Sequence, residues 1–240
     1  MLMVNLVLVM ALAVLCAKYR IPLKVIRRLT GQSKAADGVI DPVLTEQYKR
    51  HCDIFRSSPR DEETIVMLGD SLTETTPFDE LLGFRFKIRN RGISSDNTRG
   101  VLNRIDETAG LRAAKVFILL GINDIGNGIP LDESMRNYRE IVRRIRLASP
   151  DTRIYVQSVF PVDHKKLEDN ARCRRRTSSA IREFNAELVR LAQEEGCEFL
   201  DTYSVFDVGD GEMDGGCTFD GLHLNGEGMM RWCRFLEPYM

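Results

Sequence analysis

Four short segments of this sequence contain residues that could carry out hydrolytic chemistry. The first is Gly69-Asp70-Ser71-Leu72, which directly follows the apolar run 64–68. Gly, Asp and Ser are also common in ordinary turns. However, a β-branched apolar run of this length is typical of a buried parallel strand. A serine just after such a strand would lie at the carboxyl edge of a sheet, where open α/β folds bind their ligands.

The other three segments occur in a fixed order behind the first. They are Arg91-Gly92-Ile93, Gly121-Ile122-Asn123-Asp124 and Asp220-Gly221-Leu222-His223. The first two follow strand-like runs, and the last precedes a C-terminal amphipathic stretch. Because the ends of parallel strands meet at one edge of a sheet, we expect all four segments to line a single crevice.

Serine chemistry needs a base that accepts the hydroxyl proton. His223 is the best candidate, because His51 falls inside an expected helix and His164 follows a strand without a motif of its own. Asp220 lies three residues before His223 and can accept a hydrogen bond from its Nδ1, which would set the tautomer. The alternative role for Asp220 is to cap the following turn.

Hydrolysis also needs donors for the developing oxyanion. We expect these to be the backbone N–H of Ser71, the backbone N–H of Gly92 and the side-chain amide of Asn123. Gly92 suits the role because a residue without a Cβ lets substrate approach the backbone. An Asx-turn is the alternative role for Asn123. Asp70 and Asp124 are expected to brace loops by accepting backbone N–H bonds.

With these four blocks in this order, the chain resembles the SGNH (GDSL-type) hydrolases, which are named for the Ser, Gly, Asn and His of the blocks. The resemblance covers residues 60 to 240. Segments 92–104 and 219–224 resemble most closely the catalytic subunits of platelet-activating-factor acetylhydrolase type Ib and related small bacterial esterases. The resemblance implies a serine ester hydrolase that acts on a small-molecule ester.

Strand-like and helix-like patterns alternate along the chain between these segments. Strands are expected near 64–68, 86–89, 115–120, 153–159 and 197–201, and helices near 42–55, 97–108, 132–148, 178–195 and 226–238. This alternation is typical of βαβ units and therefore of a parallel sheet with helices on both faces. The family resemblance implies a flavodoxin-like, three-layer α/β/α fold whose five strands are ordered 2-1-3-4-5.

Composition fits one globular domain and excludes some partners. Of the 240 residues, 43% are hydrophobic, which is enough for a substantial core. The formal net charge of −1 gives no overall field to attract nucleic acid, so we expect no nucleic-acid partner. A local basic run contains Arg172, Arg174, Arg175 and Arg176. We expect it to form a solvated helix face; the alternative is a site for an anionic group of a substrate or lipid headgroup.

No metal or cofactor is expected. Three histidines are too few for an obvious zinc site. The acidic stretch 210–215 resembles the start of a calcium loop, but its twelfth position is Gly221 instead of Glu. Neither a Gly-x-Ser-x-Gly elbow nor a nucleotide-binding glycine signature occurs. The six scattered cysteines favour buried thiols over a disulfide framework, although a single disulfide stays open as an alternative.

Three regions are expected along the chain: an apolar leader (1–17), a basic linker (18–40) and the hydrolase domain (41–240). As a helix the leader would be about 25 Å long, slightly short of a ~30 Å hydrocarbon core. Its positive charges follow the apolar run instead of preceding it. We expect a signal anchor that gives membrane association; the alternative is a cleaved signal with export. The trailing charges favour a cytoplasmic domain, but orientation stays open.

Three functions are compatible with these residues. The first is a serine esterase that removes small acyl groups, above all acetyl, from sugar or lipid esters. The second is a lysophospholipase or thioesterase that takes longer acyl chains. The third is a catalytically silent binding module; intact Ser71, Asn123 and His223 argue against it.

Overall fold

A five-stranded parallel sheet organises the part of the chain that this computed structural model describes, residues 43 and 45–240. The strand order is β2-β1-β3-β4-β5, which confirms the predicted flavodoxin-like arrangement. The strands are β1 (Ile65–Gly69), β2 (Ile88–Gly92), β3 (Lys115–Leu119), β4 (Arg153–Gln157) and β5 (Glu198–Leu200). In the register of the two strands that lead to the site, Gly69 of β1 lies opposite Gly92 of β2.

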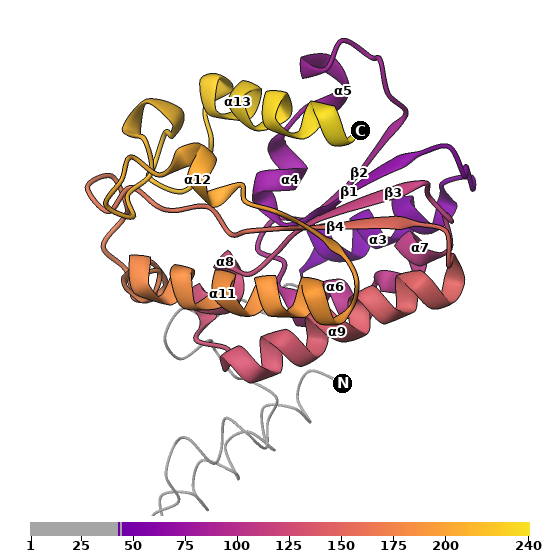
Figure 1. Cartoon of the computed structure of the whole chain (residues 1–240), viewed down its shortest axis with the longest axis horizontal. Helices are drawn as coiled ribbons and strands as arrows, with labels where there is room; N and C mark the ends of the chain where they lie inside the picture. The colour runs from indigo at the N-terminus through magenta and orange to yellow at the C-terminus, as the bar shows by residue number, and fades with distance from the viewer. Residues whose placement is uncertain (1–42, 44) are drawn as a thin grey trace, which may run out of the picture. The chain divides into compact units, whose positions relative to one another are not determined.

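Helices cover both faces of this sheet, as expected for βαβ units (Figure 1). One face carries α3 (Glu46–Ser57), α6 (Thr98–Asn103), α7 (Ile105–Ala109), α9 (Leu131–Ala148) and α11 (Ser178–Glu194). The other face carries α4 (Ser71–Thr75), α5 (Phe78–Leu81), α12 (Tyr203–Phe206) and α13 (Gly226–Leu236). Two further short helices, α8 (Ile122–Asn127) and α10 (Ala171–Arg175), and the 3-10 turns Gly215–Cys217 and Glu237–Tyr239 complete the described elements.

Two apolar cores follow from the alternation of side chains along each strand. Val66 and Leu68 of β1 are buried in the core beneath α6, α9 and α11. Met67, between them, is buried in the opposite core with α4 and α13. Residues on both faces of the central strands are therefore apolar, and the sheet forms a rigid base whose carboxyl edge carries the site.

The structure corrects two expectations about the helices. The single helix expected at 97–108 is two helices, α6 and α7, which meet at Arg104. The Arg104 guanidinium is buried at this break, where it pairs with Asp96 and donates to the carbonyls of Gly69 and Arg91. Short helices α4 and α8, which were not among the expected helices, begin within three residues of the ends of β1 and β3. Their first turns carry the residues of the site.

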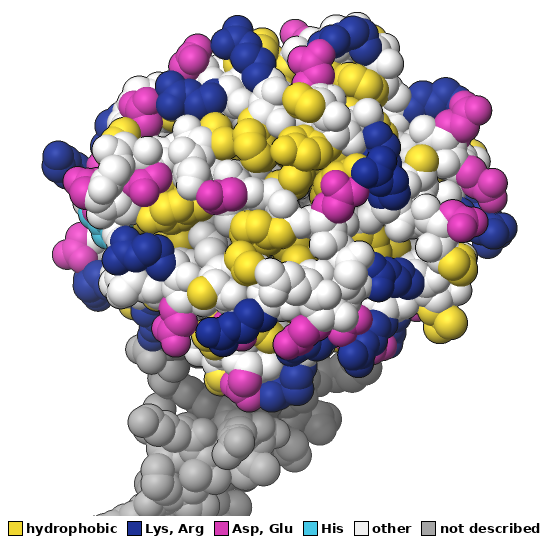
Figure 2. Space-filling model, viewed as in Figure 1, with side chains coloured by type: hydrophobic (Ala, Val, Ile, Leu, Met, Phe, Trp, Pro, Cys, Tyr) yellow, Lys and Arg dark blue, Asp and Glu magenta, His cyan; other side chains and the backbone are white. Residues whose placement is uncertain are grey.

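The surface in view in Figure 2 carries basic and acidic side chains interspersed, as the net charge of −1 leads one to expect. Within residues 43 and 45–240, no helix is both long and apolar enough to cross a membrane. The expected leader (1–17), linker (18–40) and domain boundary at 41 lie outside the described residues.

Candidate active site

Ser71 is the first residue of α4 and lies at the carboxyl end of the fully buried strand β1. Asp70 precedes it as the N-cap of the helix, and its Oδ1 accepts the backbone N–H of Leu72 at 3.0 Å. A capping carboxylate at this position satisfies a helix N–H that has no partner within the helix. The sharp change from strand to helix therefore holds the serine hydroxyl at the sheet edge.

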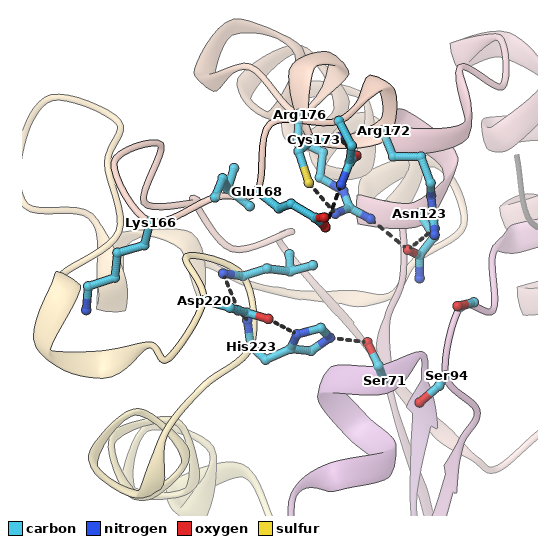
Figure 3. A pocket seen from close by; sticks show the side chains of 14 residues that line it. Ser71, Ser94, Asn123, Lys166, Glu168, Arg172, Cys173, Arg176, Asp220 and His223 are labelled. Atoms are coloured by element: carbon cyan, nitrogen blue, oxygen red, sulfur yellow. Dashed lines mark hydrogen bonds and ion pairs between the residues drawn. The ribbon is translucent and has the colours of Figure 1, made fainter. Parts of the chain in front are cut away.

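His223 and Asp220 complete a hydrogen-bonded chain with Ser71, although His223 lies 152 residues further along the sequence. Ser71 Oγ lies 3.0 Å from His223 Nε2, and His223 Nδ1 lies 2.7 Å from Asp220 Oδ2 (Figure 3). The other carboxylate oxygen of Asp220 accepts the backbone N–H groups of Leu222 and His223. All three predicted residues are thus brought together in the order Ser–His–Asp.

The electrostatics of Asp220 suit a partner for an imidazole. Partial burial acts to raise the pKa of Asp220, but hydrogen bonds from the His223 ring and from the N–H groups of His223 and Leu222 outweigh it. The net pKa is lowered, so the carboxylate stays ionised. A carboxylate in this position keeps a hydrogen on Nδ1 and leaves Nε2 to accept the serine proton.

Asn123 lies in the first turn of α8 and is 4% exposed. Its Nδ2 donates to the backbone carbonyl of Asp96 at 2.9 Å, and Asp70 Oδ2 lies 3.4 Å from the same nitrogen. Its side chain lines the same cavity as Ser71 and His223. The structure therefore brings Asn123 to the site, as predicted, with its amide nitrogen on the side of the nucleophile.

The structure does not place Gly92, an expected oxyanion donor, at the cavity. Its backbone N–H donates to Asn90 Oδ1 at 2.9 Å, and Gly92 does not line the cavity. A Cβ at this position would lie 2.7 Å from Glu74 Cα and 2.8 Å from the carbonyl oxygen of Asp70. The glycine is therefore required because the backbone of α4 packs directly on the last residue of β2.

Ser95 supplies a backbone N–H near the position expected for Gly92. Ser95 lines the cavity beside Ser71 and Asn123, and its N–H has no hydrogen-bond partner among the described residues. Its φ of 67° lies in the left-handed region, which non-glycine residues rarely adopt. Glu74 of α4 holds the preceding residue by accepting the Ser94 N–H at 2.7 Å. Ser95 lies three residues beyond Gly92, and nothing in the sequence around it indicated that its backbone would adopt this conformation or that the residue would line the cavity.

The basic run is not the solvated helix face that we expected. Arg176 is 4% exposed and Arg172 is half-buried, and both line the cavity. Arg172 Nη2 donates to Asn123 Oδ1 at 2.9 Å, and Arg176 Nη2 donates to the same oxygen at 3.0 Å. Arg174, in contrast, is exposed and pairs with Asp169. Helical spacing alone could not separate these residues, because α10 is only five residues long.

Buried carboxylates lie behind the cavity. Burial raises the pKa of Asp70 to about 7 and the pKa values of Asp96 and Asp124 to about 6. Asp124 accepts the N–H of Thr98 at 3.1 Å and its hydroxyl at 2.6 Å. Asp70 and Asp124 therefore brace the loops through backbone N–H groups, as predicted.

The other candidate residues are used elsewhere. His164 is bonded to Glu212 at 2.7 Å, and His51 lies 3.0 Å from Glu74. Glu212 belongs to the stretch that resembled a calcium loop. Among residues 43 and 45–240, no group of three or more His, Cys, Asp or Glu side chains is placed to hold a metal ion. The described cysteines are all free: Cys52, Cys173, Cys197, Cys217 and Cys233.

The site occupies a cavity of about 460 Å³ that opens at the carboxyl edge of the sheet. Most of its lining is polar or charged, including Ser71, Asn123 and Arg172. Its apolar lining comes from Leu167, Leu222 and the side chain of Cys173. Polar side chains and a few apolar ones therefore surround Ser71 together.

Comparisons with known proteins agree with this geometry. Residues 67–231 match the model of the GDSL-like Lipase/Acylhydrolase family. The GDSL esterase/lipase CPRD49 of Arabidopsis thaliana is 27% identical over 188 residues, which cover 68% of this chain and 73% of that protein.

Solved structures share the fold. A Streptococcus pneumoniae protein, provisionally named for platelet activating factor, is 29% identical, with a TM-score of 0.75 over 82% of this chain and 94% of its own. Two further structures have the same fold. A GDSL-like lipase from Bacteroides thetaiotaomicron is 22% identical, with a TM-score of 0.68 over 80% of this chain and 96% of its own. An acetylxylan esterase from Geobacillus stearothermophilus is 19% identical, with a TM-score of 0.59 over 75% of this chain and 94% of its own. The chain belongs to the GDSL-like Lipase/Acylhydrolase family and is an ester-bond hydrolase.

Proposed function

We propose that this hydrolase removes small acyl groups, above all acetyl, from a sugar or lipid ester by a serine mechanism. One observation carries the proposal: Ser71 Oγ, the His223 ring and the Asp220 carboxylate form a continuous chain of hydrogen bonds in the lining of the cavity. A nucleophile, a base within reach of it and a carboxylate that orients the base are the parts that acyl transfer to serine requires.

In this mechanism Ser71 Oγ attacks the ester carbonyl while His223 Nε2 accepts its proton. The tetrahedral oxyanion receives hydrogen bonds from the N–H of Ser71, the N–H of Ser95 and Nδ2 of Asn123. Collapse of the intermediate breaks the bond to the alcohol, which takes the proton from His223. Water, deprotonated by His223, then attacks the acyl-serine, and the carboxylic acid and free Ser71 are released.

The lining of the cavity supports a short acyl group and a polar alcohol. Leu167 and Leu222 are the leucines of a lining otherwise dominated by Ser, Asn, Lys, Glu, Arg and Asp side chains. A hydrocarbon chain placed among those groups would remove them from water without supplying hydrogen bonds, which is unfavourable. This argues against the alternative, a lysophospholipase or thioesterase that takes longer acyl chains. An acetylxylan esterase is among the proteins that share the fold.

The test is hydrolysis of a chromogenic ester series from acetate to octanoate by the wild type and by Ser71→Ala. We expect kcat/KM to be highest for acetate and to fall with chain length, and Ser71→Ala to be inactive on every ester. A preference for octanoate would support the long-chain alternative. Turnover that survives in Ser71→Ala would refute the serine mechanism, and a wild type without turnover would support a silent binding module.

We also propose that residues 1–17 associate the enzyme with a membrane, or direct its export if they are cleaved. The apolar character of that segment and the basic residues that follow it support this proposal.

A further inference from the structure

Two arginines donate to one amide oxygen in the cavity. Nη2 of Arg172 and Nη2 of Arg176 lie 2.9 Å and 3.0 Å from Asn123 Oδ1, and both side chains reach it from the α10 segment (Figure 3). An amide oxygen has two lone pairs, and here each has a cationic donor. A flipped amide would turn its NH2 group toward two guanidinium groups that can only donate. The arginines therefore determine which way the Asn123 amide points.

This orientation presents the amide nitrogen to the reaction centre. Nδ2 has two hydrogens, and the first bonds to the carbonyl of Asp96 at 2.9 Å. The contact to Asp70 Oδ2, at 3.4 Å, is longer than an ordinary N–H···O bond. The second hydrogen is therefore only weakly engaged before a substrate oxyanion forms.

The fold holds both guanidinium groups in place without a carboxylate partner. Arg176 Nε donates to the carbonyl of Ile122 at 3.2 Å. Gly126 of α8 leaves the necessary space, because a Cβ there would lie 2.9 Å from Arg176 Nε. Among the described residues, neither Arg172 nor Arg176 has an acidic group within ion-pair distance. Burial and the neighbouring Arg176 lower the pKa of Arg172, so bringing the two charges together has an electrostatic cost.

We propose that Arg172 and Arg176 are positioning residues that orient and polarise the Asn123 amide so that it stabilises the oxyanion. This inference rests on the proposed serine mechanism. Hydrogen bonds from ionised donors are about twice as strong as neutral ones, and linked hydrogen bonds polarise one another. Two cations on Oδ1 draw electron density from the amide and make Nδ2 a stronger donor. The gain is largest in the transition state, where the negative charge develops.

Arg172→Met is the primary test, because Arg172 is half-buried and its replacement keeps a long side chain. Loss of a complete oxyanion donor costs about 10²–10³ in kcat, so loss of one supporting arginine should lower kcat about ten- to a hundredfold. The KM for a neutral acetate ester should stay within about threefold. Arg172→Lys keeps the charge and should restore part of kcat.

Arg174→Met is the matched control, since Arg174 lies on the same helix, is exposed and does not line the cavity. Its kcat should equal that of the wild type. Thermal unfolding of every variant separates a loss of fold from a loss of positioning.

Gly126→Ala provides a second perturbation, because its Cβ displaces the Arg176 guanidinium without removing any charge. This variant should also lower kcat more than it changes KM.

A double-mutant cycle with Asn123→Ala decides whether the arginine acts through the amide. If it does, Arg172→Met should slow the wild type but leave the already slow Asn123→Ala variant unchanged. Equal effects in the two backgrounds would overturn the inference.

The rival explanation is that Arg172 binds an anionic group of the substrate. A raised KM for a succinate half-ester, with unchanged kcat on both the succinate and the acetate ester, would support that role and also overturn the inference. Failure of the proposed function gives a different result. An additive cycle in an active wild type refutes only the arginine role, whereas a wild type that hydrolyses no ester refutes both.

Discussion

Gly92→Ala tests whether this glycine packs the catalytic helix or donates to the oxyanion. Alanine keeps the backbone N–H, so a pure donor role predicts a nearly normal enzyme. The structure predicts the opposite, because the new Cβ would meet the backbone of α4 at Glu74 Cα (2.7 Å) and at the Asp70 carbonyl (2.8 Å), and still more closely at Glu74 N. Ordinary contacts of a Cβ begin at 3.4 Å.

The expected losses of stability and of rate follow from the overlap of the new Cβ with α4. Relief requires α4 and β2 to separate by more than half an ångström, and both are backbone segments at the sheet edge. Overpacking of this kind costs about 1–3 kcal/mol of the free energy of unfolding. Ser71 is the first residue of α4, and a displacement of about 1 Å from reactive geometry can cost about a hundredfold in rate.

The assay combines urea unfolding with kcat on an acetate ester. Gly226→Ala is the matched control, since no atom lies within 4 Å of a Cβ built there, and its stability should be unchanged or slightly higher. We expect Gly92→Ala alone to lose both stability and kcat. If Gly92→Ala matches Gly226→Ala in both measurements, the packing argument is wrong.

Three further predictions concern charge, metal and the N-terminal segment. Burial raises the pKa of Asp70 from 3.8 to about 7, so the contribution of this carboxyl to stability is present below pH 4 and is lost as the pH rises through 7. In the wild type the free energy of unfolding should therefore decline between pH 4 and pH 8, and Asp70→Asn should remove up to about 4 kcal/mol of that decline. Parallel stability–pH curves for the two proteins would contradict this. Ester hydrolysis should survive EDTA; a loss restored by one particular divalent ion would revive the acidic stretch 210–215 as a metal site. Deleting residues 1–28 should leave kcat unchanged while the intact chain fractionates with membranes or is processed, and an aggregated or inactive truncation would make the segment part of the domain core.

The sequence predicts the strands, and the residues that meet at the candidate site, better than it predicts the connections. The strands could be identified because both faces of each central strand are buried, so that runs such as 116–120 are continuously apolar. Ser71, Asn123 and His223 could be identified because each follows a strand or precedes a helix within a short motif. The order of the sheet came from the family resemblance, and the structure confirms it.

The rest of the site depends on contacts between distant segments, which local patterns do not encode. Gly92 and Ser95 are three residues apart, and only the bond from Gly92 N–H to Asn90 and the left-handed turn at Ser95 distinguish their roles. Arg172 and Arg176 looked like part of a solvated face, because their partner, Asn123, lies about fifty residues earlier in the chain. Such roles require the folded arrangement.

The separation of 152 residues between Ser71 and His223 has a consequence for how activity arises during synthesis. Ser71 and the strands around it emerge from the ribosome long before the segment 220–223. In the proposed mechanism, the serine has no base until that segment arrives and is no more nucleophilic than a serine on any surface. The proposed mechanism therefore requires residues 220–223, and a fragment that stops before residue 220 would be silent even with its sheet formed. In that mechanism the turnover rate of a preparation counts only the molecules in which residues 220–223 are present and folded against Ser71.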